Sequence, residues 1–415
     1  RRGMSFVDEM SWRGLIKQVS HETLGEVMRA GSMTLYSGFD PTASSLHVGN
    51  LMPVMAMVRA QRHGHTPVVL VGGATGMIGD PSGKASERKL LDAEELHNNS
   101  VGIHQQLERF VDFSGKNAAK MVNNYDWFKG LGYLEFMRDV GKHFSVNMML
   151  AKDSVKTRLE DRDSGISYTE FSYMLIQAYD YLWLSDHHDC RLQIGGSEQW
   201  GNITAGMELI RRMRGKEAYA MTLPLLVDAE GKKFGKSEQG AVWLDTSRTS
   251  VYDFYQYFLR ADDHDVPKLL RFLTLLPLAE IEAIEREHLA APEKRHGQKV
   301  LAREMTTLVH GAAAFAEAEK AAAALFGPRA AGAIPEGAPT FAIAALPLSL
   351  VDALVQSGLC SSKKDARREM EGGGVYVNDV RIQKTDHALT EADLRDGAIL
   401  LRRGKKSYMV LRLGS

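Results

Sequence analysis

The sequence has only two cysteines, Cys190 and Cys360, and they lie far apart in the chain. Because they form no C-x-x-C pair, we expect neither a disulfide framework nor a zinc ribbon, but two reduced thiols of a cytoplasmic protein. Separately, we expect no resident metal ion or organic cofactor. No run of about 18 uninterrupted apolar residues is present, which excludes a typical membrane-spanning helix. The first residues lead into Ser-Phe-Val-Asp-Glu instead of an apolar segment, so we expect no signal peptide.

The sequence also lacks an excess of charge of one sign. It holds 51 Lys and Arg against 52 Asp and Glu, which gives no overall reason to expect a nucleic-acid partner. The distribution is uneven, however. Residues 346–415 hold 12 Lys and Arg against 9 Asp and Glu, a net charge of +3 that leaves −4 for the rest of the chain. A basic C-terminal segment on an acidic body favours an appendage that contacts nucleic acid.

Alternating strand and helix patterns in the first half of the chain predict a doubly wound, parallel α/β domain. Residues 34–39 and 67–71 are predicted strands on either side of a helical pattern at 46–62, which makes a βαβ unit. From residue 250 to 326 the pattern is helical without strands. We expect four parts: a catalytic α/β domain over 1–228, a mobile loop with an α-helical domain over 229–326, an Ala/Gly/Pro-rich linker over 327–345, and a small α+β domain over 346–415.

The first motif with chemical meaning is His47-Val-Gly49-Asn50, where the first predicted strand of the βαβ unit passes into its helix. Parallel sheets bind ligands at such strand ends, and a helix N-terminus offers free N–H groups and a positive dipole end to a phosphate. His47 can donate to a phosphate oxygen, and Gly49 lets a nucleotide approach the backbone. The alternative is a histidine that only caps the helix. Pro53 stands in the same helix and distorts it unless it lies in the first turn.

A second motif, Lys232-Lys233-Phe-Gly-Lys236-Ser237, lies about 185 residues further on. Gly231, directly before it, and Gly235 predict a flexible loop from which Lys233 and Lys236 can face one anion. The alternative is a solvated basic turn.

Three further stretches place polar residues where ligands bind. Asp80-Pro-Ser-Gly-Lys84 with Arg88 is similar to a phosphate loop but lacks the Walker A spacing. A segment from Gln193 to Asn202 follows a predicted strand and opens a helix. A third stretch carries polar residues at helical spacing, each of which needs a partner if it faces a core, although an ordinary polar helix face is the alternative. These residues are Tyr173, Gln177 and Asp180.

The two motifs in this order resemble the paired signatures of the class I aminoacyl-tRNA synthetases. With the three further stretches, they resemble the bacterial tyrosyl-tRNA synthetases over nearly the whole chain. The resemblance implies a Rossmann-like catalytic domain and a homodimer that ligates tyrosine to tRNA(Tyr). ATP and its Mg²⁺ are used to form tyrosyl-adenylate, and the tRNA 3′-terminal adenosine then takes the tyrosine. Catalysis rests on positioning and electrostatic stabilisation, without a covalent nucleophile.

The resemblance also assigns residues to each part of the site. The tyrosine-binding residues it implies are Tyr36, Asp80, Tyr173, Gln177, Asp180 and Gln199. The ATP-binding residues it implies are Ser37, Gly38, Asp40, His47, Gly49, Asn50, Gln193, Gly195, Glu198, Lys236 and Ser237. The catalytic residues, which contact the phosphates or the departing pyrophosphate, are Thr42, His47, Lys84, Arg88, Lys233 and Lys236.

The C-terminal segment resembles an S4 RNA-binding domain. Ser362 can cap a predicted helix over residues 361–371, whose basic side chains recur at helical spacing and form one face. Such a face suits RNA phosphates, and an ordinary solvated helix face is the alternative. The RNA-binding candidates are Lys363, Lys364, Arg367 and Arg368.

Three other functions compete with tyrosine ligation. A tryptophanyl-tRNA synthetase shares the catalytic fold but needs no clamp of Tyr36 and Asp180 for a phenol group, and we expect no S4-like tail on it. A nucleotidyltransferase of the same superfamily uses the His-x-Gly-x motif without that tail. A non-catalytic RNA-binding protein has no use for both Lys233 and Lys236.

Overall fold

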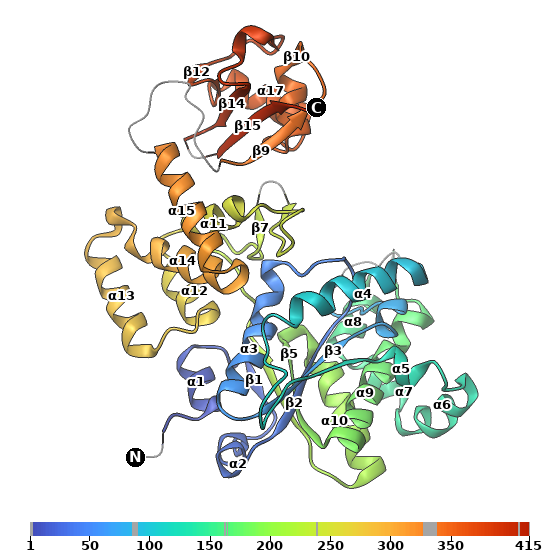
Figure 1. Ribbon diagram of the computed structural model, residues 1–415. Coiled ribbons are helices and arrows are strands. Elements are labelled where there is room, and N and C mark those ends of the chain that lie inside the picture. The colour runs from blue at the N-terminus through green and yellow to red at the C-terminus, as the bar shows by residue number, and fades with distance from the viewer. Residues whose placement is uncertain are drawn as a thin grey trace. The chain divides into compact units, whose positions relative to one another are not determined.

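The computed structural model divides the chain into two compact units, each described here by itself (Figure 1). The first comprises residues 1–233 and 271–275, and the second comprises 234–270 and 276–415. The structure describes residues 3–84, 90–161, 163, 165–237, 240–326, 338–405 and 407–414. Within these ranges no helix combines the length and apolar character needed to cross a membrane.

A six-stranded sheet in the order β1-β6-β5-β2-β3-β4 forms the centre of the first unit. All neighbouring strands are parallel except β1, which pairs antiparallel with β6. The predicted doubly wound parallel sheet is thereby confirmed. Strand β1 lies between α1 and α2 and completes the edge of the sheet by pairing with β6. The strands are β1 (Gln18–Val19), β2 (Thr34–Phe39), β3 (Thr66–Val71), β4 (Lys120–Asn123), β5 (Cys190–Gly196) and β6 (Tyr219–Leu223).

Helices connect and cover these strands, and their ends follow local sequence signals. The Ser167 side chain caps the long helix α9 by accepting from the backbone N–H of Glu170, and α10 ends at Gly215 with a φ of 61°. Pro53 lies in the first turn of α3, where no helical N–H is lost. The helices are α1 (Phe6–Trp12), α2 (Leu24–Ala30), α3 (Leu51–Arg62), α4 (Ala93–Leu107), α5 (Tyr125–Phe128), α6 (Tyr133–Asp139), α7 (Val146–Leu150), α8 (Asp153–Glu160), α9 (Tyr168–His188) and α10 (Trp200–Arg214), with short 3-10 turns η1 (Val48–Asn50), η2 (Thr75–Met77), η3 (Gly141–His143) and η4 (Ser197–Gln199).

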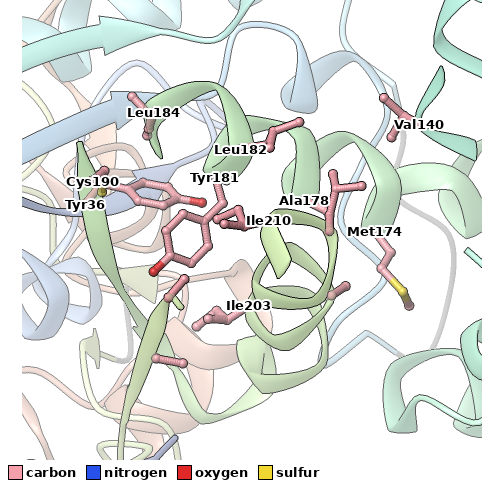
Figure 2. Close-up of a cluster of buried hydrophobic side chains, with 14 of the residues drawn as sticks. Tyr36, Val140, Met174, Ala178, Tyr181, Leu182, Leu184, Cys190, Ile203 and Ile210 are labelled. Atoms are coloured by element: carbon pink, nitrogen blue, oxygen red, sulfur yellow. The ribbon is translucent and has the colours of Figure 1, made fainter. Parts of the chain in front are cut away.

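The side chains between the sheet and helices α9 and α10 form a buried apolar cluster (Figure 2). Tyr36 of β2 lies in it with its ring edge-on to that of Tyr181, at a centroid distance of 5.4 Å. Ile203 and Ile210 of α10 complete the contact with α9. Burial of these apolar side chains contributes roughly 25 cal/mol per Å² and holds α9 against the sheet. This packing fixes the position of the polar residues of α9 relative to the strand ends.

The second unit begins with helices, as expected for residues 250–326, and the residues described there include a two-stranded ribbon of β7 (Lys236–Ser237) and β8 (Gly240–Ala241). One expectation was wrong. Residues 271–275, predicted within the helical domain 229–326, belong to the first unit, because buried Arg13 and Arg59 donate to the carbonyls of Phe272, Thr274 and a neighbouring residue at 2.8–3.0 Å. The helices are α11 (Val251–Leu259), α12 (Val266–Leu273), α13 (Leu278–Ala290), η5 (Pro292–Lys294), α14 (His296–His310) and α15 (Ala312–Phe326).

The C-terminal part of the second unit contains a five-stranded sheet in the order β12-β11-β14-β15-β9. Strand β9 pairs parallel with β15, so the predicted linker 327–345 extends too far, and the C-terminal domain already includes residue 340. The Ala/Pro-rich surroundings of Thr-Phe-Ala-Ile hid this strand in the sequence, and residues 327–337 lie outside the described ranges. The elements are β9 (Thr340–Ile343), β10 (Leu348–Ser349), α16 (Leu350–Gln356), α17 (Lys363–Glu371), β11 (Val375–Val377), β12 (Val380–Arg381), β13 (Ala388–Leu389), η6 (Glu391–Asp393), β14 (Ala398–Arg403) and β15 (Ser407–Leu413).

Candidate active site

The candidate residues of the first unit gather at the carboxyl ends of its parallel strands. Asp40 follows β2, Asp80 comes after β3, and Gln199 comes after β5. Helix α9 lies beside these ends and adds three polar side chains. Hydrogen bonds connect Tyr173 to Asp40 and Gln177 to Asn202. The charge of the third, Asp180, acts on Tyr36 of β2. The edge predicted from the βαβ pattern is therefore the place where these segments meet.

Tyr36 and Asp180 are both buried polar residues of this site. The Tyr36 side chain is 1% exposed, and its hydroxyl finds no hydrogen-bond partner within the described part of the chain. Burial raises the pKa of Tyr36 well above its usual value, and the nearby carboxylate of Asp180 raises it further. Burial also raises the pKa of Asp180, against the opposite effect of two hydrogen-bond donors, Asn124 and Trp127. A buried hydroxyl without a partner beside a buried carboxylate is suited to a ligand hydroxyl group.

Asn124 and Trp127 are site residues that the sequence analysis missed. Asn124 Nδ2 lies 3.0 Å from Asp180 Oδ2, and Trp127 Nε1 lies 3.0 Å from Asp180 Oδ1. Asn124 follows β4, so its place at the end of a parallel strand was a usable signal. Nothing local marked Trp127, because only the packing of α5 beside α9 brings its indole N–H to the carboxylate.

A second chain of hydrogen bonds connects α9 to the end of β2. The hydroxyl of Tyr173 donates to Asp40 Oδ2 at 2.7 Å, and Thr75 Oγ1 donates to Asp40 Oδ1 at 2.6 Å. Burial raises the pKa of Tyr173 well above its usual value, and Asp40 and Asp80 raise it further. The Tyr173 hydroxyl therefore remains protonated at neutral pH and keeps its own lone pairs for a further donor.

Asp80 lies in a cluster of oxygen-bearing side chains. Its Oδ1 accepts from the backbone N–H of Ser82 at 2.8 Å, and its Oδ2 accepts from Gln199 Nε2 at 2.7 Å. Asn202, another residue missed as a site candidate, places its Nδ2 3.2 Å from Gln177 Oε1 and 3.5 Å from Asp80 Oδ1. Several acceptor oxygens thus lie close together, as binding of an ammonium group requires.

The His47 motif forms the first turn before α3. His47 Nδ1 accepts from the backbone N–H of Gly49 at 3.0 Å, and Asn50 Oδ1 accepts from the backbone N–H of His47 at 3.0 Å. The capping alternative is therefore correct for Nδ1. Because Nδ1 is the acceptor, the neutral ring carries its proton on Nε2, which is the atom that can donate to a phosphate. Thr42, five residues earlier, is exposed.

The loops after β3 and β5 approach each other closely. A side chain at Gly83 would meet the side chain of Glu198 at 3.7 Å, and one at Gly195 would meet Gln199 at 3.0 Å. Gln193 is buried in β5, and its Oε1 has no partner among the described residues. The other candidates of the first unit have these places: Ser37 is buried in β2, Gly38 is exposed there, Gly49 lies in η1, and Lys84 is exposed at the end of the loop after β3.

The remaining predicted site residues lie at the end of the first unit, in the second unit or outside the described residues. Arg88 lies outside the described residues. Lys233 ends the first unit in an isolated bridge with Val227, whereas Lys236 and Ser237 form β7 of the second unit. All four RNA-binding candidates are exposed on α17, where the Ser362 side chain accepts from the backbone N–H of Asp365, as expected for a cap.

The chain was compared with known families and proteins. Residues 28–327 match the model of the class I tRNA synthetases (W and Y), and residues 331–411 match the C-terminal domain of tyrosine–tRNA ligases. The tyrosine–tRNA ligases of Roseiflexus castenholzii and Bacillus caldotenax are 49% and 48% identical to it; each match covers 99% of this chain and 99% and 100% of the relative, respectively.

A solved mitochondrial tyrosyl-tRNA synthetase of Coccidioides posadasii, truncated at its C-terminus, is 33% identical with a TM-score of 0.68 over 77% of this chain and 92% of that one. The full-length matches decide against the nucleotidyltransferase and the non-catalytic alternatives. The matched C-terminal domain and the names of these relatives decide against the tryptophanyl alternative. The chain therefore belongs to the tyrosine–tRNA ligases, a family of class I aminoacyl-tRNA synthetase enzymes.

Proposed function

We propose that this ligase binds the phenol group of L-tyrosine between Tyr36 and Asp180, activates its carboxylate with ATP, and transfers it to the 3′-terminal adenosine of tRNA(Tyr). The observation that carries the proposal is the buried Tyr36 hydroxyl without a partner beside the Asp180 carboxylate. A tyrosine hydroxyl between them donates to Asp180 and accepts from Tyr36. Phenylalanine leaves the Tyr36 hydroxyl buried and unpaired and adds no donor to those that Asp180 already has from Asn124 and Trp127, which is costly.

The α-ammonium group of the substrate binds to the oxygen cluster around Asp80. Asp80 supplies the negative charge, and Gln177 supplies a neutral acceptor. Tyr173 adds a lone pair, because its proton is engaged with Asp40. Gln199, bonded to Asp80, lies near the substrate carboxylate. These contacts leave the carboxylate facing the nucleotide.

The carboxylate attacks the α-phosphate of ATP and pyrophosphate departs. Thr42 and Nε2 of His47 donate to the phosphate oxygens, and four cations close on the pyrophosphate: Lys84, Arg88, Lys233 and Lys236. Mg²⁺ arrives with ATP. The tRNA hydroxyl then attacks the tyrosyl carbonyl and AMP leaves. Both steps depend on positioning and charge stabilisation. The rest of the ATP contacts come from Ser37, Gly38, Asp40, Gly49, Asn50, Gln193, Gly195, Glu198 and Ser237.

The exposed basic face of α17 binds tRNA phosphates through Lys363, Lys364, Arg367 and Arg368. We assign catalysis to residues 1–228 together with 271–275. The remainder of 229–326 supplies the mobile Lys233–Lys236 loop and helices that contact tRNA. The C-terminal part from residue 340 binds RNA. The protein works in the cytoplasm, where its tRNA is used.

A homodimer is supported by a group of exposed apolar side chains on α6, α7 and the start of α9. Leu134 is 79% exposed, Tyr168 64% and Val146 59%. The hydroxyl groups of Tyr133 and Tyr168 lie 2.9 Å apart, which connects α6 to α9. So much exposed apolar surface in one region is typical of a protein–protein interface, and a second copy of this chain is the partner we propose.

Tyrosine-dependent exchange of pyrophosphate into ATP tests the proposed activity. We expect exchange with tyrosine and at most a trace with phenylalanine or tryptophan. The variant Asp180→Ala should lose the preference for tyrosine over phenylalanine. Exchange that is equally fast with tryptophan, or a preference unchanged in Asp180→Ala, would contradict the proposal.

A further inference from the structure

Helix α4 runs alongside the segment 41–46, which joins β2 to the His47 turn. Asn99 Nδ2 donates to the backbone carbonyl of Pro41 at 3.0 Å. Two turns later, Gln106 Oε1 accepts from the backbone N–H of Leu46 at 2.6 Å. The two side chains share one face of α4 because they are seven residues apart. The segment 41–46 therefore runs in the same direction as α4, with Pro41 next to Asn99 and Leu46 next to Gln106.

Gly102 lies between these two contacts on the same face. A Cβ atom at this position would lie 2.1 Å from the backbone oxygen of Ser44, a distance that no packed structure contains. Glycine in the middle of a helix weakens the helix, so it needs a compensating reason. The reason here is that the backbone of the segment touches the backbone of α4.

Gln106 makes a second contact with the segment. Its Nε2 donates to Ser45 Oγ at 2.9 Å, and both side chains are buried. The Gln106 amide thus accepts one hydrogen bond and donates another, and its partners are two successive residues of the segment. Its loss leaves the buried N–H of Leu46 without a partner, and a buried unpaired donor forces its surroundings to move.

We propose that Asn99, Gly102 and Gln106 are positioning residues for the reaction with ATP, because they fix the backbone that carries Thr42 and His47. The segment has no helix or strand of its own between β2 and η1, so α4 supplies the rigidity that it lacks. Phosphate donors must be held within a fraction of an ångström to be effective. This inference rests on the proposed function, since it takes Thr42 and His47 as phosphate ligands.

The first test is Gly102→Ala, with Gly25→Ala in α2 as the matched control. Gly25 accepts the same added methyl group at an ordinary 3.6 Å from Val7. We expect single-turnover adenylate formation in Gly102→Ala to fall by about 10², the scale of a 1 Å misplacement. The dissociation constant for tyrosine should stay within about twofold of the native value. Tyrosine binding and adenylation that fall together, or a native rate, would overturn the inference.

The second test, which disturbs the fold less, is Gln106→Met. It retains most of the side-chain volume but removes both hydrogen bonds. Its control is Ser100→Ala on the same helix, where the hydroxyl bonds the Leu96 carbonyl of α4 itself. We expect an adenylation rate about tenfold lower for Gln106→Met, from the cost of an unpaired buried donor, with tyrosine binding unchanged. A Gln106→Met protein as fast as the Ser100→Ala control would contradict the inference.

A double-mutant cycle separates this inference from the proposed function. If Gln106 acts through His47, the effect of Gln106→Met must shrink in a His47→Ala background. An equal effect in both backgrounds means that Gln106 has a merely structural role. If His47→Ala and Thr42→Ala each leave adenylation unchanged, the assigned phosphate ligands are wrong. If His47→Ala and Thr42→Ala slow adenylation but the Gln106 and Gly102 variants do not, only the positioning role of α4 is wrong.

Discussion

Asn124 Nδ2 lies 3.0 Å from the carboxylate of Asp180, and the same side chain accepts through Oδ1 from the backbone N–H of Ala74 at 2.8 Å. Asn124 therefore connects the Asp180 carboxylate on α9 to the loop after β3. Burial raises the pKa of Asp180, whereas the hydrogen bonds from Asn124 and Trp127 lower it. Each of these two donors therefore helps to keep the carboxylate ionised and in place.

The first prediction follows from this contact. Asn124→Ala should lower kcat/KM for tyrosine by about tenfold, the scale of one hydrogen bond to a charged group, and should change kcat/KM for phenylalanine less. Asn123→Ala is the control, because Asn123 bonds the backbone of Tyr125 in the same turn without contacting Asp180. Pyrophosphate exchange with both amino acids measures the ratio. An equal loss for both would assign Asn124 to folding alone.

The second prediction concerns the loop of the second motif. Lys236→Ala should slow adenylate formation while the tyrosine dissociation constant stays nearly unchanged, because a contact made only as pyrophosphate charge develops lowers kcat instead of raising KM. Lys232→Ala is the control. Lys232 is an exposed lysine of the same motif and pairs with Glu230 at 3.4 Å. A loss that appears wholly in KM for tyrosine would refute the role of Lys236.

The third prediction concerns the basic face of α17. Arg367→Glu should weaken tRNA binding and reduce the slope of log K against log salt by about 1 for each lost phosphate contact. Pyrophosphate exchange should be unaffected. Lys384→Glu places the same charge change at another exposed position of the C-terminal domain. If both variants lose the same affinity, net charge and not the α17 face controls binding.

The fourth prediction tests the proposed dimer. Leu134→Asp puts a charge in the exposed apolar group and should convert the protein to monomers in analytical ultracentrifugation, because burying an unpaired carboxylate is costly. Leu289→Asp is the control, since Leu289 is also highly exposed, at 76%, but lies on α13. A native protein that sediments as a monomer, or a dimeric Leu134→Asp, would exclude this interface.

The fifth prediction is a pH dependence of stability. Hydrogen bonds from Arg211 and Arg212 lower the pKa of Glu208 to about 2. A carboxyl whose pKa is depressed on folding stabilises the fold above its unfolded pKa of about 4.3 and loses that contribution as the pH falls toward 2. Because the two arginines are exposed, we expect Glu208→Gln to cost only about 1 kcal/mol at pH 7.

The urea midpoints of native protein and Glu208→Gln should therefore converge as the pH is lowered from 5 to 3. Glu282→Gln, at an exposed position of α13, should show no such trend. If the difference between the urea midpoints of native protein and Glu208→Gln is the same at every pH, the ion pairs of Glu208 do not stabilise the fold.

Much of this protein is determined by short stretches of sequence. Strand β2 was predicted over its observed span, as was the parallel pairing of β2 with β3, because alternation and burial are properties of consecutive residues. The Ser362 cap and the harmless place of Pro53 also depend on neighbours within one helical turn. The motifs around His47 and Asp80 were recognisable for the same reason: their residues are close in the chain.

Only the tertiary structure decided which distant polar groups meet. Asn124 and Asp180 are 56 residues apart, and Arg59 and the carbonyl of Thr274 are 215 apart. No periodicity encodes such pairs, because they follow from the order of strands in the sheet and from the burial of α9 against it. Strand β9 was hidden for a related reason, since its four residues form a strand only by pairing with β15. Local sequence thus set most of the elements, and the packing of those elements set β9 and the partners of the buried polar atoms.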